Sequence, residues 1–241
     1  MLDGIKRWLA GGGDSAAQEW EGVAPWAAAS KYTFRGVASE GFVIDGRLGA
    51  TPWRLEWGPS QRPYISGQEL RIRSELGLSP ELQLVVMNRR LQEQMEKTVY
   101  EQFVEGVQTR IDNQTPPEMR WLVMFAKIAS EALAPIQERY VALASQKTWA
   151  EQWLAGSLVQ ALKELRVDPS VPVVLMIGRG RLMLRTALAD AELRPLQNWL
   201  RVFEIAMREA RRVANDSPES ISPSTAPSGW SQSALPGDER N

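Results

Sequence analysis

Cysteine and histidine are both absent from this chain of 241 residues. Their absence excludes a Ser-His-Asp or Cys-His catalytic group, a zinc site built on Cys or His, a histidine-ligated haem, a thiol redox centre and a disulfide scaffold. Any catalysis would have to use Asp, Glu, Lys, Tyr, Ser, Thr or Arg, all of which are ordinary surface residues. The sequence therefore predicts no catalytic residue, no metal site and no cofactor, and it favours a protein that is not an enzyme.

Long apolar runs are missing too. No stretch approaches the roughly 18 to 20 apolar residues of a membrane span, and no secretory signal follows Met1, so we expect a cytoplasmic protein. Charge of one sign is not in excess, because 28 Lys and Arg stand against 29 Asp and Glu. Such a near-neutral balance argues against a nucleic acid as the partner.

Composition divides the chain into three parts. Residues 1–13 combine a short amphipathic segment, Met1–Leu9, with a glycine linker, and residues 14–214 contain the apolar residues of a globular body. Residues 215–241 are rich in Ser, Pro and Gly and are predicted to be a disordered tail. The amphipathic segment is long enough for a peripheral membrane contact, but a helix of this length binds a bilayer only weakly.

Two regions of the body have the pattern of antiparallel strands. Residues 32–76 alternate apolar and charged side chains, above all at Trp53–Trp57 and from Tyr64 to Leu76, as is typical of a sheet with one packed and one solvated face. The dipeptide Asp45-Gly46 predicts a tight turn within this region. Residues 173–185 predict a hairpin around Gly178-Arg179-Gly180.

Other segments have helical periodicity. Helices are predicted over residues 88–107, where apolar side chains recur every four positions, and over residues 195–214. Thr115–Glu118 matches the capping-box pattern, and so does the start of a helix predicted over 148–165. Helical signals also dominate from Pro135 onward.

The order of these segments predicts the fold class. We expect an α+β protein, in which a mostly antiparallel sheet is covered by amphipathic helices. A sheet-like stretch followed by a long helix occurs twice, so the body consists of one unit or of two halves, 32–110 and 115–214. Residues 82–87 and 121–125 are each compatible with a strand or a helix.

The densest group of charged residues lies in two of the predicted strands. If 53–57 and 69–73 pair, their charged side chains share one face, where arginine forks would grip a carboxylate or a phosphate. The competing interpretation is a ladder of cross-strand ion pairs on a solvated face, each worth ~0.2 to 1 kcal/mol. The candidate binding residues, including two at the rim, are Arg54, Glu56, Arg62, Tyr64, Glu69, Arg71 and Arg73.

Two further patterns are explained by folding alone, without a binding role. The chain is rich in tryptophan, with ten residues, and those on predicted apolar faces are expected in the core: Trp53, Trp57, Trp149, Trp153 and Trp199. The last predicted helix also carries an arginine stripe opposite its apolar face, formed by Arg194, Arg201, Arg208 and Arg212. A solvated helix face explains this stripe, although RNA, acidic lipid or an acidic partner would also fit it.

These observations favour a non-catalytic protein that binds another macromolecule. We expect an unidentified protein partner and place the first candidate surface on the charged strands at 54–73. The alternative is an enzyme built on carboxylates and arginine, such as a Mg²⁺-dependent one acting on a phosphorylated or glycosidic substrate. That alternative requires converging Asp or Glu side chains.

Overall fold

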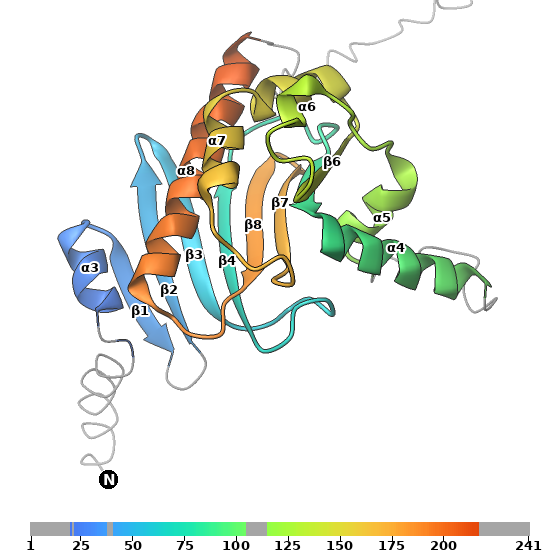
Figure 1. The fold of residues 1–241 in the computed structure, drawn as a ribbon. Coiled ribbons are helices and arrows are strands. Elements are labelled where there is room, and N and C mark those ends of the chain that lie inside the picture. Colours follow the sequence, from blue (N-terminus) through green and yellow to red (C-terminus); the bar gives the residue numbers. More distant parts are fainter. Residues whose placement is uncertain (1–19, 21, 38–40, 105–114, 217–241) are drawn as a thin grey trace, which may run out of the picture.

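Eight antiparallel strands form one sheet in this computed structural model, which describes residues 20, 22–37, 41–104 and 115–216 (Figure 1). Their order across the sheet is β1-β2-β3-β4-β8-β7-β5-β6. The strands are β1 Thr33–Val37, β2 Gly41–Leu48, β3 Thr51–Pro59, β4 Gln68–Glu75, β5 Leu84–Asn88, β6 Tyr140–Ala144, β7 Val173–Gly178 and β8 Arg181–Ala187. The predicted α+β class is confirmed. Because β4 pairs with β8 and β5 with β7, strands from 32–110 and from 115–214 share this sheet.

Helices cover one face of the sheet along most of its width. The described helices are α3 Val23–Ala29, α4 Arg89–Val104, α5 Pro117–Met124, the 3-10 helix η1 Glu131–Leu133, α6 Lys147–Leu154, α7 Ser157–Glu164 and α8 Leu193–Asp216. Figure 1 shows α8 lying across the strands, with α6 and α7 beside it. We call this side the helical face. The indole N–H of Trp153 donates to the carbonyl oxygen of Ala206 at 3.0 Å and joins α6 to α8.

The opposite face is divided between a small core and a charged surface. At one end, α4 and α5 pack against β5 and β6 over apolar side chains that include Met87, Trp121 and Met176. On β2, β3 and β4 the same side carries what we call the charged face: Asp45, Arg54, Glu56, Glu69, Arg71 and Arg73.

The strand pairing and the tryptophan positions follow the predicted alternation. Leu55 lies opposite Ile72, and both are fully buried under the helical face, whereas Glu56 lies opposite Arg71 on the charged face. Trp53, Trp149, Trp153 and Trp199 are all buried in the core, as predicted, and Trp57 is half-buried against it. Period-two alternation therefore identified the faces correctly, although the second strand begins at Gln68 and not at Tyr64 as predicted.

The turn predicted at Asp45-Gly46 is wrong. Strand β2 continues to Leu48, and the chain reverses at Gly49, which has φ 60°. Gly46 pairs with Trp53 in the sheet, and a Cβ atom at Gly46 would lie 2.2 Å from the indole ring of Trp53. The glycine is thus explained by close packing under an aromatic ring, which removes the need for a turn.

Both capping boxes are also wrong. Helix α5 begins after Pro116 and α6 after Gln146, and neither of these residues makes a side-chain cap hydrogen bond. Glu118 does not turn back to the helix start but points into the protein interior. The helix predicted over 148–165 is two helices, α6 and α7, which are separated at Gly156, where φ is 79°.

One strand was missed in a region predicted to be helical. Residues 140–144 form β6, which pairs with β5 and is buried on both faces. A short apolar run without alternation does not distinguish a strand from a helix, so periodicity failed here. The same ambiguity is resolved in favour of a strand at Leu84–Asn88 and of a helix at Pro117–Met124.

The predicted hairpin and last helix are confirmed. The chain reverses between β7 and β8 at Arg179 and Gly180, with φ of 54° and 77°, the backbone that a two-residue type I′ hairpin requires. Helix α8 includes Asn215 and Asp216, which were assigned to the tail. The predicted segment 1–13 and residues 217–241 lie outside the described residues. In the described ranges, no helix combines the length and the apolar character that crossing a bilayer requires.

We expect Gly46→Ala to lower the free energy of unfolding by about 1 to 3 kcal/mol, because the new Cβ overlaps the Trp53 indole. Urea unfolding measures the loss. Combining it with Trp53→Phe should cost less than the sum of the two single changes, since a smaller ring leaves room for the methyl group. Strictly additive losses would contradict the proposed contact.

Candidate functional site

The outer layer of the charged face is a ladder of ion pairs. Strands β3 and β4 pair as predicted and place Arg54 opposite Arg73. Asp45, which the sequence did not single out as a site residue, accepts hydrogen bonds from Arg54 Nε at 2.7 Å and from Arg35 at 3.0 Å. Burial alone would raise the pKa of Asp45, but these two guanidinium groups outweigh burial and lower it below its ordinary value. Asp45 is therefore held as a carboxylate between two arginines.

Glu56 on the neighbouring strand is likewise held between two arginines, two residues along β3 from Arg54. Its carboxylate accepts from Arg71 Nε at 3.3 Å and from Arg73 at 3.0 Å. Each acid of this outer layer is thus matched by cations across the strands. Such an arrangement stabilises a solvated sheet face and leaves no carboxylate free for chemistry.

Beneath this ladder lies a buried ion pair between β4 and β8. Glu69 is fully buried and forms a short salt bridge with Arg185 of β8, whose side chain is 8% exposed. Glu69 also lies 3.5 Å from Arg71 and accepts the backbone N–H of Gln61 at 2.8 Å. The sequence nominated Glu69 but missed Arg185, because their contact joins residues 116 positions apart.

A second buried carboxylate comes from α5. Glu118 is completely buried, and its Oε1 atom accepts from Arg62 Nε at 2.7 Å and from the Tyr64 hydroxyl. Burial raises the pKa of Tyr64, and the charge of Glu118 raises it further. The other oxygen of Glu118 is buried and has no hydrogen-bond partner in the described structure. Arg62 and Tyr64, predicted at the rim of a site, therefore fasten the loop after β3 to α5.

These contacts show what the predicted residues can do chemically. Glu69 and Glu118 are the buried carboxylates of this region, and both are enclosed and charge-matched by arginine. A general acid or base has to reach the proton that it transfers, and a fully buried, paired carboxylate does not. The arrangement is suited to holding elements in place.

A groove opens beside this network, between α5 and the β7–β8 hairpin. Its volume is about 340 Å³. Apolar side chains line it from both elements, namely Trp121, Met124, Met176 and Met183. Met124 is 62% exposed, which is unusual for a large apolar side chain. Gly178 lies in the wall, where an added Cβ would come within 2.8 Å of the Trp121 ring, so the absence of a side chain lets α5 approach the hairpin.

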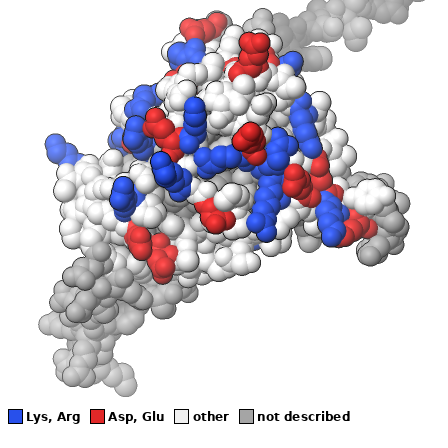
Figure 2. All heavy atoms as spheres, in the orientation of Figure 1, with Lys and Arg blue, Asp and Glu red and all other residues white. Residues whose placement is uncertain are grey.

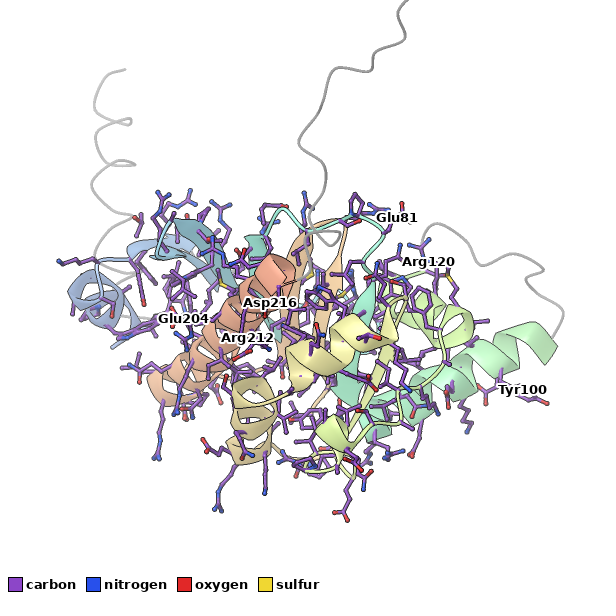
Figure 3. The ribbon with its side chains drawn as sticks, turned by 90° about the horizontal axis from the view of Figure 1, so that it is seen from above. Glu81, Tyr100, Arg120, Glu204, Arg212 and Asp216 are labelled. Atoms are coloured by element: carbon purple, nitrogen blue, oxygen red, sulfur yellow. The ribbon has the colours of Figure 1, made fainter. Side chains whose placement is uncertain are left out.

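Four arginines also line the groove: Arg62, Arg120, Arg179 and Arg181. Arg62 is paired with Glu118, and Arg181 with Glu75. In the described part of the chain, Arg120 and Arg179 make no ion pair, and the Nε atom of Arg120 is buried without a hydrogen-bond partner. Figure 3 shows Arg120 on α5, at the end of the molecule away from α3.

Sequence reasoning missed this groove for an identifiable reason. Arg179 was assigned to a turn, and 121–125 were treated only as an apolar run of uncertain type. The available signal was the helical spacing of Trp121 and Met124 next to Arg120, which puts aromatic, apolar and basic groups on one short helix. Nothing in the sequence showed that the hairpin would lie against it.

Comparisons with known proteins identify no family. No protein-family model matches the chain, and no curated protein matches it. One solved structure, the crystal structure of the mycobacterial trehalose monomycolate transport factor A, TtfA, aligns with a TM-score of 0.44 and 8% sequence identity over 84% of this chain and 95% of that chain. A likeness at this level supports no statement about fold or function.

We expect Glu69→Gln to lower the free energy of unfolding by about 3 to 5 kcal/mol, because it leaves Arg185 buried without a counter-charge. Glu56→Gln is the matched control on the same face. It breaks pairs that solvent still reaches, and Arg71 keeps Glu69 at 3.5 Å, so it should cost no more than about 1 kcal/mol. Urea unfolding of both variants tests the distinction between the two layers. Equal losses would show that the buried layer has no special role.

Tyr64 generates a prediction for alkaline pH. Its pKa is higher in the folded state than in the unfolded chain, where it is ~10. The contribution of Tyr64 to stability is therefore fully present below that pH. It is lost as the pH rises further, because only the unfolded chain then releases the proton. Between about pH 9.5 and 11.5 the wild type should lose up to ~1.4 kcal/mol per pH unit from this residue. Tyr64→Phe should have a shallower decline in urea-unfolding free energy over the same range. Parallel declines would contradict the assignment.

Proposed function

We propose that this chain is a cytoplasmic, non-catalytic protein that binds a protein partner in the groove between α5 and the β7–β8 hairpin. One observation carries the proposal: unpaired Arg120 and Arg179 lie beside the exposed Met124 and the partly buried Met183. The surface combines cationic donors with adaptable apolar groups. Its complement is a segment that presents acidic and apolar side chains together.

Charge complementarity supports an acidic ligand. A buried donor without a partner costs about 1 to 3 kcal/mol, and Arg120 Nε is such a donor. The terminal nitrogens of the Arg120 guanidinium are not buried, so a carboxylate from a partner would bind the arginine there through charge-assisted bonds. The neighbouring arginines of the groove are already occupied, so Arg120 and Arg179 remain for a ligand.

The apolar lining supports a peptide segment. Methionine side chains are flexible and polarisable, so they pack against apolar groups of different shapes. The groove is open and about 340 Å³ in volume, which suits one or two side chains of an extended segment. A protein partner would supply such side chains on one continuous chain.

The charged face contributes only additional contacts in this proposal. Its acids are matched within the sheet, which supports the ladder interpretation for Arg54, Glu56, Arg71 and Arg73. Arg73 retains 47% side-chain exposure. We infer that a longer partner would extend from the groove past Arg62 to this residue, gaining modest and salt-sensitive contacts there.

The enzyme alternative gains no support from the described residues. A Mg²⁺-dependent reaction requires converging carboxylates. Within the described ranges, no group of three or more Asp and Glu lies close enough to hold a metal ion.

A peptide selection tests the proposal. Random peptides displayed against the full chain should be enriched in neighbouring acidic and aliphatic residues. A fluorescent peptide from that set should bind the Arg120→Gln/Arg179→Gln double variant at least about tenfold more weakly, since each charge-assisted bond is worth ~1.5 to 3 kcal/mol. Met124→Asp should weaken binding too, because it places a like charge beside the acidic ligand. Fluorescence anisotropy gives the dissociation constants.

Two controls make the outcome decisive. Arg47→Gln alters an exposed arginine of β2 whose hydrogen bond goes to the backbone of Ala50, and it should leave the affinity unchanged. Equal weakening by Arg47→Gln, or equal binding of peptides with Asp replaced by Asn, would refute the groove. Deleting 217–241 should also leave the affinity unchanged. A marked gain would instead identify the chain's own acidic tail as the occupant.

A further inference from the structure

A second hollow lies on the helical face, between α7 and α8. Its volume is about 440 Å³, and its polar lining consists of Glu164, Arg166, Arg194, Asn198 and Arg201. This site is separate from the groove of the proposed function, because α7 and α8 cover the sheet on the side opposite the charged face. Figure 2 views the helical face directly and shows Lys and Arg side chains over these two helices, with Asp and Glu side chains among them.

Two helices bring the three arginines together. Arg194 and Arg201 are seven residues apart on α8, so they lie on the same side of the helix with a rise of about 10.5 Å between them. Arg166 follows the end of α7, where Leu165 is the C-cap. Packing of α7 on α8 thus brings the three arginines to the lining of one hollow.

These arginines differ from their neighbours in having no protein acceptor. In the described structure, none of the three forms an ion pair or a side-chain hydrogen bond. Arg212, further along α8, instead donates to Glu209 at 2.8 Å and to the backbone oxygen of Gln152 at 2.8 Å. The arginine stripe recognised in the sequence therefore separates into a structural part at Arg212 and an unoccupied part at the hollow.

The charge and shape of the lining define the ligand. Three arginines against one glutamate leave two positive charges in excess, which matches a dianion. Guanidinium forks bind phosphate oxygens in a bidentate manner, and the Asn198 amide can donate to or accept from a hydroxyl group. Ala161 and Val202 add a small apolar surface for the body of the ligand.

We propose that the hollow between α7 and α8 is a binding site for a phosphate monoester with a small hydroxylated body. Its volume limits the enclosed portion to a compact group and excludes a duplex nucleic acid from entering. The same chemistry occurs in a free phosphorylated metabolite and in the headgroup of an anionic phospholipid. The experiment therefore needs one arm for each source.

Calorimetric titration of the full chain provides the first arm, with sn-glycerol 3-phosphate as the probe and glycerol as its uncharged counterpart. We expect a dissociation constant below about 1 mM at roughly 0.15 M salt, and no binding of glycerol. The second arm measures co-sedimentation with phosphatidylcholine vesicles that contain phosphatidic acid or phosphatidylserine. Binding of the free ester alone identifies a soluble ligand, and selective binding of phosphatidic acid vesicles identifies a headgroup.

Variants connect the binding to the hollow. Arg194→Gln and Arg201→Gln should each weaken binding at least about tenfold, and Arg201→Lys should weaken it less, because lysine keeps the charge but loses the fork. Arg208→Gln is the matched control. It lies two further turns along the same side of α8 and outside the hollow, so it should change the affinity less than about twofold. All of these residues are exposed, and the melting temperatures should stay unchanged.

Three results would overturn the proposal. The first is that neither glycerol 3-phosphate nor phosphatidic acid vesicles bind. The second is equal weakening by Arg208→Gln and Arg201→Gln, which would indicate a diffuse field from the whole helix. The third is equal binding of vesicles with either anionic lipid, which would indicate non-specific attraction. None of these outcomes bears on the groove beside α5, which is tested with peptides.

Discussion

Two carboxylates that are completely removed from water impose the central constraint on this structure. Glu69 and Glu118 have no exposed surface, and a buried charge is tolerated only when a cation meets it where it lies. For Glu69 the cation is Arg185, on the strand that joins the two sequence-distant parts of the sheet. For Glu118 it is Arg62, from the loop after β3. Both pairs connect segments that are far apart in the chain.

The position of α5 follows from this constraint. Because Glu118 is fastened to Arg62 and Tyr64, the helix is held against the sheet beside the β7–β8 hairpin. Trp121 then packs over Gly178, where a side chain would not fit. The groove lined by Met124 and unpaired arginines is the space left along this contact. A surface with exposed apolar groups is thus supported by a rigid, charge-matched interior.

The pairing of charges also distinguishes surfaces that have similar compositions. On the charged face each acid lies between arginines, so the charges stabilise the sheet and offer little to a ligand. In the described structure, Arg120 and Arg179 beside α5, and the three arginines of the hollow between α7 and α8, line concave surfaces without carboxylate partners. An arginine without an acceptor, placed in a hollow, is available to an anion in a way that a paired arginine is not. Both proposals rest on this difference.

Sequence by itself determined the features that depend on local pattern. Alternation assigned the faces of β3 and β4, the glycine turn identified the β7–β8 hairpin, and apolar periodicity located α8. These features were predictable because the periods of strands and helices depend only on the spacing of side chains along the chain. The candidate residues Glu69, Arg62 and Tyr64 were also found there, but without the buried partners that they have in the fold. Only the tertiary structure decided that Glu118 enters the interior instead of capping α5, that Gly46 makes room for Trp53, and that residues 140–144 form a strand. In each case the deciding partner lies in another element, and the burial that selects one conformation exists only after the chain has folded.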